Sequence, residues 1–462
     1  MSMLFNGLSG VVASQVALDA VSQNLANALT PNYTRQGVVL TAKAAVNTDL
    51  SAGNGVAATS LVRYSDSYKT QQLWRSNSNL GQYEAEQTYL LQLEQVMGDA
   101  SAGLSTALDQ FFSALSAASV EPASSPLRQQ IIEQAKALGQ SVGNLSQILS
   151  NQKAAVAQQR QVAVDQLNSY TTQIAALNAK IIQANGAGLN TSALEDQRDA
   201  QVDALSKLVG LQTMTQPNGS INLSLRGGQP LVVGDRSAQM AVKADGQGYR
   251  LEVAFGSETF ALQSSDWLGT LGGLTVLETD VLNALDDSVR SMAEEIATSV
   301  NNVLRSGFGV QGAPDADLLA RDLFVFDPAS SAQILTVNPN MTSDKLGLSD
   351  TLDEAGNSEQ LQKLVALQQT PVNIVGLGNG IYLGDVYTQL VGKLGTYSQQ
   401  SIASYGTAKT VRDQSQSNWS STSAVNTDEE AVNLMQYQQM YQANMKVIAT
   451  ANELFDSLLS LR

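Results

Sequence analysis

The sequence predicts a mainly α-helical, discontinuous multi-domain chain with a small antiparallel β domain inserted between its helices. Proline placement is the first observation behind this prediction. No proline occurs from Leu127 to Gln216 or after Pro371, so both stretches can be largely helical. The second observation is a series of short apolar runs separated by turn dipeptides between Leu211 and Phe260. The third is a seven-residue spacing of apolar side chains at both ends of the chain.

Composition restricts the functions that the chain can have. Its 462 residues, 43% apolar and 15% charged, fit a folded protein of several domains. The absence of histidine and cysteine removes the commonest proton shuttle, thiol nucleophiles, cysteine-ligated metals and disulfides. The net charge of −16 argues against nucleic-acid binding, which needs clustered Lys and Arg. We therefore expect no catalytic residue, no cofactor and no metal.

The apolar N-terminal segment "GLSGVVASQVALDAVSQNLANAL" raises the question of a membrane span. Gln, Ser, Asp and Asn interrupt it too often for a span, and no basic start of a secretory signal peptide precedes it. We expect no membrane contact and no cleaved leader.

Long helices are predicted before the β segment. One runs from about Ser67 to Met97. Another begins at Ser125-Pro126, with serine as a cap and proline at the first helical position, and ends at Asn185-Gly186. Apolar side chains recur in it every seventh residue from Val142 to Leu177, as in a coiled coil. The next helix is expected to open with a capping box of Ser192 and Glu195.

The middle of the chain carries hairpin signals. Asn218-Gly219, Gly227-Gly228 and Asp245-Gly246 separate short alternating apolar runs, and such dipeptides favour the tight turns that need positive φ. After this segment, "LETDVLNALDDSVRSMAEEIATSVNNVL" is again helical in pattern, a loop and strand follow, and helix resumes from about Leu383.

The two ends carry matching apolar rows. In the first helix the row consists of Leu4, Leu8, Val11, Leu18 and Leu25. The last helix is expected to open at Thr427 with Glu430 three residues on. Its row consists of Leu434, Tyr441, Ile448 and Phe455 at seven-residue spacing, with Met445 and Leu459 beside it. Two rows of the same period predict that the ends pair as a coiled coil.

This terminal pair buries too little apolar surface to offset the entropy of ordering both segments. We therefore expect the ends to be frayed in an isolated subunit and ordered when neighbouring chains cover their remaining faces. The predicted domains are residues 1–36 with 425–462, a helical core with some β structure at 37–210 with 271–424, and a β-rich outer domain at 211–270.

The stretch "ANALTPNYTRQ" ends the first helix. Asn24 and Asn27 offer side-chain amides to free backbone groups, Pro31 forbids helix through Thr30, and Tyr33 can fill a gap where the chain leaves the helix. The predicted joint between the terminal helix and the rest of the chain consists of Asn27, Pro31, Asn32, Tyr33 and Arg35.

Both ends resemble a known family. "NLANALTPNYTRQ", Asn24 to Gln36, resembles the N-terminal signature of bacterial flagellar axial proteins of the rod, hook and junction group. "VNTDEEAVNLMQYQQMYQANMKVIATANELFDSLLSLR", Val425 to Arg462, is similar to the C-terminal helix of the same group. Two interior blocks, "LEDQRDAQVDALSKLVG" and "GTLGGLTVLETDVLNALDDSVRSMAEEIATSVN", resemble the hook–filament junction members. Asn32 stands where the family often has glycine, and the short β segment suggests a missing outer domain.

This resemblance implies a structural, non-enzymatic subunit that joins hook to filament and is secreted through the flagellar type III pathway into the extracellular flagellum. Its terminal helices would form an inner tube around the export channel. The implied partners are copies of itself in a helical ring, the flagellar hook protein, the second hook–filament junction protein and a flagellar export chaperone.

Two alternatives remain beside this interpretation. One is another flagellar axial protein of the hook or rod type, and the other is a secreted hydrolase. For a hydrolase, the acidic pairs Asp286-Asp287 and Glu294-Glu295 could supply two carboxylates, although a solvated helix face is favoured. Asp315, Asp317 and Asp322 lack the glycine and closing glutamate of a calcium loop. "GLGNG", Gly376 to Gly380, does not match a dinucleotide-binding spacing, so a plain turn is favoured.

Overall fold

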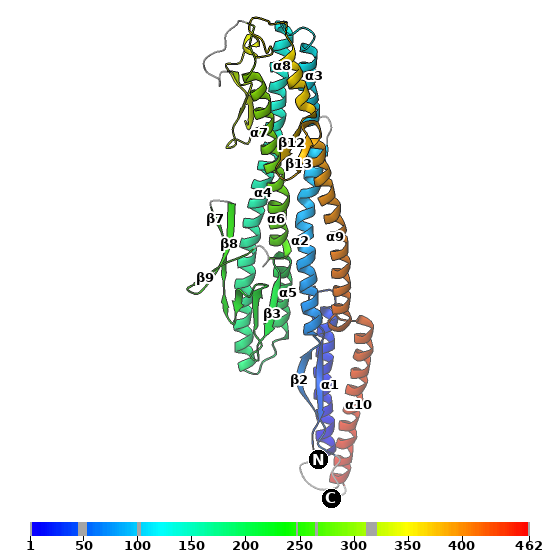
Figure 1. The fold of residues 1–462 in the computed structure, drawn as a ribbon. Helices are drawn as coiled ribbons and strands as arrows, with labels where there is room; N and C mark the ends of the chain where they lie inside the picture. The colour runs from blue at the N-terminus through cyan, green and yellow to red at the C-terminus, as the bar shows by residue number, and fades with distance from the viewer. Residues whose placement is uncertain are drawn as a thin grey trace. The chain divides into compact units, whose positions relative to one another are not determined.

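Long helices and small antiparallel sheets make up the fold, as the sequence predicts (Figure 1). The structure is a computed structural model, and it describes residues 2–44, 53–98, 103–245, 248–263, 267–310 and 321–460. The chain forms two compact units. The first consists of Met1–Gly81, Ala163–Thr270 and Thr407–Arg462, and the second of Gln82–Val162 and Leu271–Gly406.

The helices divide between these units. The first unit holds α1 (Ser2–Ala26), α5 (Ser192–Leu208) and α10 (Thr427–Ser460). Longer helices belong partly to each unit: α2 (Ser67–Gly98), α4 (Ser125–Gly186) and α9 (Val386–Ser423). The second unit adds α3 (Leu104–Ala118), α7 (Asn283–Arg305) and α8 (Glu359–Ala366). Helix α6 (Gly269–Val276) continues into α7 through a π-helix, η3, at Leu277–Leu282.

The strands of the first unit are all paired antiparallel. A hairpin of β1 (Gln36–Ala42) and β2 (Val56–Arg63) packs on α1. A four-stranded sheet consists of β3 (Leu211–Thr215), β4 (Ile221–Leu225), β5 (Pro230–Val233) and β6 (Arg236–Ser237). A three-stranded sheet consists of β7 (Gln239–Asp245), β8 (Gly248–Phe255) and β9 (Glu258–Ala261).

The turn signals of this β segment are confirmed at two places. Gly219 and Gly228 have φ of 87° and 90°, the left-handed region that the dipeptides indicate. Asp245 ends β7, whereas Gly246 lies outside the described residues. The second unit holds short hairpins of β10 (Phe324–Phe326) with β11 (Leu335–Val337) and of β12 (Pro371–Ile374) with β13 (Gly378–Tyr382).

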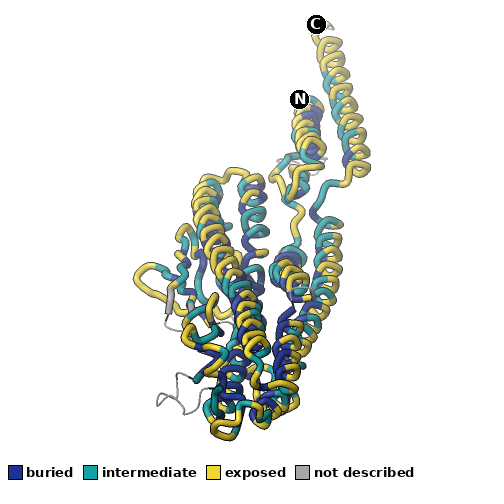
Figure 2. The backbone as a smooth tube through the Cα atoms, turned by 90° about the horizontal axis from the view of Figure 1, so that it is seen from above, coloured by how far each residue is buried: buried dark blue, intermediate teal, exposed yellow. Residues whose placement is uncertain are grey.

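The core of the second unit follows the predicted seven-residue spacing of α4. Val142, Leu149 and Val156 are completely buried there. Apolar side chains of α2, α3, α7 and α9 complete the same cluster. Figure 2 marks buried residues along the backbone in dark blue. The spacing works because a seven-residue repeat returns to nearly the same helix face, so one stripe of α4 stays covered.

Several predicted boundaries agree with the structure, whereas both capping boxes are wrong. Helices α2 and α4 begin and end within a residue of their predicted limits. The residue before α5 is Thr191, not Ser192, and its hydroxyl donates to Glu195 Oε1 at 2.7 Å. At α10 the side chain of Asn426 accepts from the backbone N–H of Asp428, at 3.0 Å. An Asx residue one position earlier reaches the free N–H groups as well as Ser or Thr does.

Several elements were not foreseen in the sequence, among them the β1–β2 hairpin, helices α3 and α8, and the β12–β13 hairpin. The three-domain division stays a prediction. Two of its parts, the terminal segments and residues 211–270, lie within the first unit.

Candidate interaction site at the chain termini

Helices α1 and α10 lie side by side, as the matching ends of the sequence predict (Figure 1). Glycines allow their close approach. A Cβ atom on Gly7 would lie 2.9 Å from Ile448 Cγ1, and one on Gly10 would lie 2.4 Å from Asn444 Oδ1. Side chains at these two positions would push the helices apart, so small residues set the distance between them.

The buried face of α1 therefore differs from the predicted leucine row. Val11 is buried, Leu4 and Leu18 are half-buried, and Leu8 and Leu25 are exposed. The face that α1 buries consists of Gly7, Gly10, Val11, Ala13, Ser14, Ala17, Ala20, Val21 and Asn24. One part of it meets α10, and another meets the hairpin, where the backbone N–H of Val56 donates to Ser9 Oγ at 3.1 Å.

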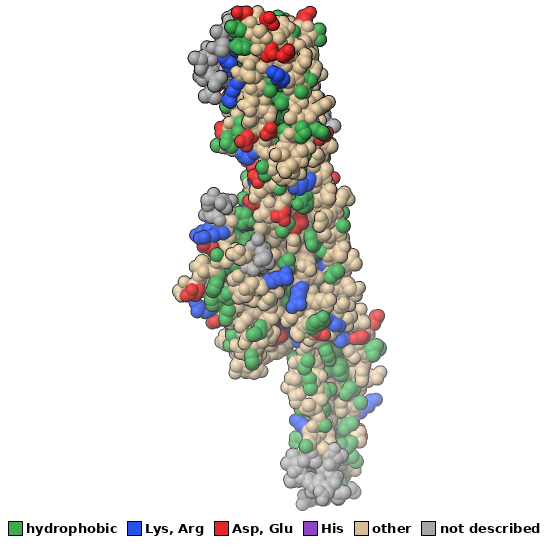
Figure 3. All heavy atoms as spheres, viewed as in Figure 1, with side chains coloured by type: hydrophobic (Ala, Val, Ile, Leu, Met, Phe, Trp, Pro, Cys, Tyr) green, Lys and Arg blue, Asp and Glu red, His purple; other side chains and the backbone are tan. Residues whose placement is uncertain are grey.

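On α10 the predicted row is more exposed towards the C-terminus of the helix. Leu434, Tyr441 and Ile448 are half-buried, whereas Met445, Phe455 and Leu459 are exposed. Figure 2 shows most of α10 as exposed, and Figure 3 shows apolar side chains on the visible face of the terminal helices. The structure thus places part of the row against α1 and leaves the rest uncovered.

Large apolar side chains are exposed along both terminal helices, and they continue around a groove of about 530 Å³ beside the hairpin. This terminal apolar surface consists of Met3, Phe5, Leu8, Val12, Val432, Met435, Met440, Met445, Leu454, Phe455, Leu458 and Leu459. Exposed apolar area of this extent marks a protein–protein or membrane contact in a soluble protein.

The length and composition of Met3–Ala26 would also suit a membrane span. However, 44% of the most apolar window is buried inside the protein. A helix that packs within a protein passes the same test, so this property alone assigns no membrane contact.

The predicted joint is organised by the amide of Asn24. Its Nδ2 donates to the carbonyl of Gln36 at 2.8 Å and to Glu430 Oε2 at 3.1 Å. Its Oδ1 accepts from the Tyr33 hydroxyl at 3.0 Å and from the N–H of Gln36 at 2.9 Å. One buried side chain thus ties the end of α1 to the first residue of β1 and to the start of α10.

The residues of the turn itself explain how the chain leaves α1. Asn27 Nδ2 donates to the carbonyl of Gln23 at 2.9 Å, and Pro31 is exposed. Asn32 has a φ of 61°, so it adopts the left-handed conformation that glycine adopts easily. Burial, the nearby Asp196 carboxylate and the Glu430 carboxylate raise the pKa of Tyr33 to about 12, which keeps its hydroxyl a donor.

Arg35 makes the contacts on the other side of the joint. Its Nη1 lies 2.5 Å from Glu429 Oε2, and its guanidinium carbon stacks 4.7 Å from the ring centre of Tyr64. Its backbone N–H donates to the carbonyl of Ser423 at 2.8 Å. The chain leaving α1 is therefore held to the end of α9 and the first turn of α10.

A buried ion pair connects the joint to α5. The N–H of Thr34 donates to Asp196 Oδ2 at 3.2 Å, and Arg63 Nε donates to Asp196 Oδ1 at 2.8 Å. Burial raises the pKa of Asp196, while Arg63 acts in the opposite direction. Arg63 also lies 2.8 Å from Asp199 Oδ2, so the guanidinium bridges two carboxylates of one helix.

Sequence reasoning missed several residues of this site. Gly7 and Gly10 carry a recognisable signal, namely small residues three apart on an apolar helix. Glu430 was expected to cap its own helix, and no local pattern places it beside Asn24. Asp196 and Arg63 lie far apart in sequence and carry no signal at all.

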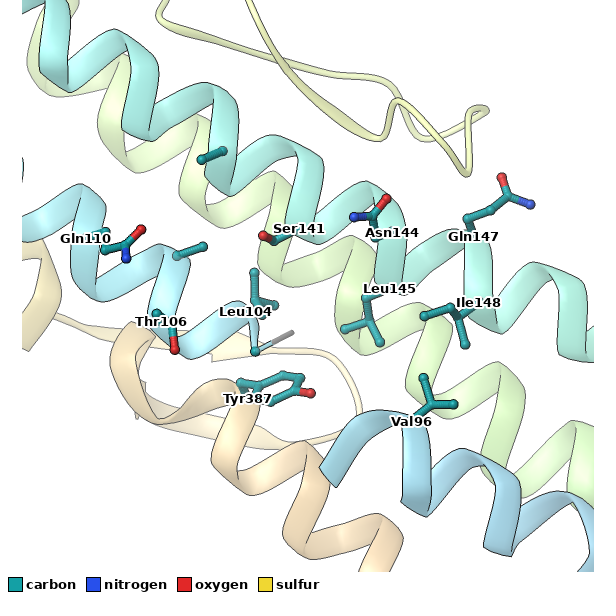
Figure 4. A pocket seen from close by; sticks show the side chains of 13 residues that line it. Val96, Leu104, Thr106, Gln110, Ser141, Asn144, Leu145, Gln147, Ile148 and Tyr387 are labelled. Carbon is teal, nitrogen blue, oxygen red and sulfur yellow. The ribbon is translucent and has the colours of Figure 1, made fainter. Parts of the chain in front are cut away.

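The second unit contains a hollow of about 680 Å³ that Figure 4 shows from close by. Leu104, Leu145 and Ile148 line it together with amide and hydroxyl side chains, and Tyr387 donates from its hydroxyl to the carbonyl of Met97 at 2.7 Å. None of its 13 lining residues is charged. A hollow lined in this way offers no acid–base pair for hydrolysis.

Some of the acidic residues considered for catalysis or cation binding have structural partners, whereas Asp287 and Glu294 are exposed on α7. Asp286 pairs with Lys153 at 2.8 Å and with Arg290, and Asp322 pairs with Arg305. Asp315 and Asp317 lie outside the described residues. Among the described residues no cluster of three or more acidic or other metal-ligating side chains occurs. Gly376–Gly380 lies at the turn between β12 and β13 and the start of β13.

Comparison with known proteins supports the resemblance. Residues 90–319 match the family described as the flagellar hook-associated protein FlgK helical domain. Residues 416–461 match the flagellar basal body rod FlgEFG protein C-terminal family.

Curated relatives match over the whole chain. The flagellar hook-associated protein 1 of Salmonella typhimurium is 27% identical over 557 positions, covering 100% of both chains. That of Bacillus subtilis is 26% identical over 502 positions, covering 100% of this chain and 99% of its own. Both alignments are longer than the 462 residues here, so these relatives carry segments that this chain lacks.

A solved structure shares the fold. The flagellar hook junction protein FlgK from Burkholderia pseudomallei matches with a TM-score of 0.64 and 17% identity, covering 75% of this chain and 99% of its own. The family match, the full-length relatives and the shared fold agree with the paired terminal helices. The chain therefore belongs to the flagellar hook-associated protein 1 family and is a structural component of the bacterial flagellum.

Proposed function

We propose that the chain is the subunit that joins hook to filament, and that α1 and α10 make the contacts between subunits. The observation that carries this proposal is the terminal apolar surface. Leu454, Phe455, Leu458 and Leu459 are exposed on one short stretch of helix, where a single chain gives them nothing to pack against. Covering such side chains in a ring of subunits would contribute roughly 25 cal/mol for each Å² removed from water.

The proposal includes the predicted route and partners. The subunit would be exported unfolded by the flagellar type III pathway and would reside in the extracellular flagellum. Its partners would be copies of itself in a helical ring, the hook protein, the second hook–filament junction protein and an export chaperone over the C-terminal helix. An unpaired apolar α10 would otherwise be prone to aggregate before export. No catalytic role is proposed.

A matched pair of variants tests the assembly role. Leu458 on α10 and Leu189 in the loop after α4 are similarly exposed, at 67% and 64%. In a strain that lacks its own copy, we expect Leu458→Asp to abolish filaments while hooks stay intact and flagellin is secreted as monomer. Leu189→Asp, which adds the same charge elsewhere, should restore filaments. Equal filament counts in the two strains would contradict the proposal.

Hydrogen exchange tests the prediction that both ends of the chain are frayed in an isolated subunit. In an isolated, verified monomer we expect fast exchange over residues 2–26 and 427–460 and slow exchange over the buried part of α4. A terminal pair without neighbours buries little apolar area, so its helices should open readily. Strong protection of both ends in the monomer would refute this expectation.

A hook or rod subunit is the second candidate. It is favoured by the match of residues 416–461 to the basal body rod family. The position of the protein in isolated hook–filament structures separates the two candidates. A place between hook and filament supports the junction role, whereas a place along the hook or rod supports the alternative.

A further inference from the structure

The second unit contains a cavity of about 220 Å³ that is separate from the terminal helices. It lies among α2, the π-helix η3 and α9. Polar and apolar side chains share its wall, and the polar ones that the argument uses are Gln82, Glu86, Asp280, Gln400 and Ser401. At about 30 Å³ for each water molecule, the cavity has room for an ion and part of its hydration shell.

Glu86 is the acidic group inside this cavity. Its side chain is only 7% exposed, and the amide of Gln82 donates to its Oε1 at 3.1 Å. Asp280 is the charged group that acts on it, and Asp280 is also negative. A buried carboxylate without a positive partner is unfavourable, so the site favours a cation.

Ser401 supplies a second, independent indication of a ligand. It lies on α9, lines the same cavity as Glu86 of α2, and is 6% exposed. Its Oγ is buried and makes no hydrogen bond with any described protein group. Buried hydroxyl groups normally have a partner, so a ligand or an ordered water in the cavity has to provide one.

The π-helix places Asp280 at the mouth of the cavity. Asp280 is exposed, and Thr279 Oγ1 donates to its Oδ1 at 2.7 Å. The wider turn of a π-helix shifts the side chains that follow it, and such turns occur frequently at functional sites. Arg160 pairs with Glu278, the neighbouring acidic residue of η3.

We propose that this cavity binds a calcium ion between α2, η3 and α9. The ligands would be the carboxylates of Glu86 and Asp280, the hydroxyl of Ser401, amide oxygens of Gln82 or Gln400, and water. Ca²⁺ accepts six to eight oxygen ligands in irregular geometry, whereas Mg²⁺ demands a near-ideal octahedron and Zn²⁺ prefers nitrogen and sulfur.

The affinity of such a site would be modest. The described residues supply two carboxylates rather than a cluster of three, so water has to complete the shell. Sites of this kind in extracellular modules bind Ca²⁺ with a Kd of about 10⁻⁴ to 10⁻³ M. The ion would join three segments of the unit through one contact, so its binding should also raise the thermal midpoint of unfolding.

Calorimetric titration of the full-length protein with CaCl₂ at pH 8, in 150 mM NaCl, tests the proposal. We expect one saturable site per chain, at least tenfold weaker in Glu86→Gln and measurably weaker in Ser401→Ala. Glu84 provides the matched control, because it lies two residues away on α2 and is exposed outside the cavity. Glu84→Gln should bind as the wild type does.

Several results would overturn the proposal. These are no saturable binding of Ca²⁺ to the wild type, equal binding by the Glu86 and Glu84 variants, or tighter binding of Mg²⁺ than of Ca²⁺. Circular dichroism and thermal unfolding in EDTA show whether each variant is folded, so misfolding is separated from ligand loss. The result is independent of the junction role, which filament assembly measures.

Discussion

Asn24 and Glu430 share a buried hydrogen bond although 406 residues separate them in the chain. Their side chains are 1% and 2% exposed, and the bond joins the last turn of α1 to the first turn of α10. The same amide also holds both backbone groups of Gln36. The position of the terminal helix pair thus depends on one fully satisfied side chain at the joint.

Removing that amide should loosen the joint. Asn24→Ala removes the hydrogen-bond partner of the buried Glu430 carboxylate and of both backbone groups of Gln36. We expect a loss of about 2 to 4 kcal/mol from the unfolding free energy of the first unit, since unsatisfied buried groups bear their full desolvation cost. Urea unfolding monitored by exchange in β1 and α10 measures it.

A double-mutant cycle isolates the Asn24–Glu430 contribution. Glu430→Gln keeps an acceptor oxygen for Asn24 and should cost less than Glu430→Ala. The energies of Asn24→Ala and Glu430→Ala should be clearly non-additive, because both remove the same bond. Strict additivity would mean that the bond contributes nothing in solution.

Local patterns in the sequence predicted much of the fold. Proline-free stretches were enough for the limits of α2 and α4. The seven-residue spacing gave the buried face of α4 from Val142 to Ala163, but Tyr170 and Leu177 farther along the row are only half-buried. Asn218-Gly219 predicted its turn since glycine accepts the positive φ found there. The signature at Asn24–Gln36 indicated the joint.

The long-range part of the site could not be predicted. Leucine spacing on α1 suggested a wide apolar row, but the contact with α10 is set by Gly7 and Gly10, whose role depends on how closely another helix approaches. The spacing of Glu430 fits a capping box, but its carboxylate instead accepts a hydrogen bond from the amide of Asn24. A partner from the other end of the chain overrides a local preference, and only the three-dimensional contact reveals it.

Asn32 allows a test of backbone conformation at the joint. Its φ of 61° costs a side chain with a branched Cβ much more than it costs asparagine. We expect Asn32→Val to lower the unfolding free energy of the first unit by about 1 to 2 kcal/mol. Asn32→Gly should change it by less than about 1 kcal/mol, since glycine adopts this φ freely but loses more entropy on folding. Thermal unfolding of both variants measures the difference, and equal effects would argue against a left-handed Asn32.

Glu86 makes the stability of the second unit depend on pH. Burial raises the pKa of Glu86 from 4.5 to about 7, and the Asp280 carboxylate acts in the same direction. Below pH 4.5 both the folded and the unfolded chain hold this proton, so the group has no effect. As pH rises towards 7 the unfolded chain releases the proton first, which favours unfolding, and the full cost is on the order of 3 kcal/mol.

Glu86→Gln should therefore be more stable than the wild type at pH 8 and no more stable at pH 4.5. The measurement is urea unfolding in EDTA, so that no divalent cation stabilises the carboxylate. Glu84→Gln is the control, and its effect on the unfolding free energy should be small because Glu84 is exposed. A gain in Glu86→Gln that does not grow between pH 5 and 8 would show that Glu86 titrates normally.

Ile448 tests the terminal pair itself. It is half-buried, and its Cγ1 lies against the backbone of α1 at Gly7. Ile448→Asp places a charge in this contact, and α1 carries no Lys or Arg that could offset its desolvation. We expect the second unit to stay folded, as the thermal transition of purified protein shows, while incorporation into flagella is lost.

The control for Ile448→Asp is Thr450→Asp on the same helix. Thr450 is exposed, so the new charge stays in water and the pairing of α1 with α10 should survive in hydrogen exchange. If Ile448→Asp pairs α1 with α10 normally and still fails to assemble, the residue acts at a contact between subunits instead. Normal filaments from Ile448→Asp would refute both roles, because a buried aspartate could not be tolerated at either contact.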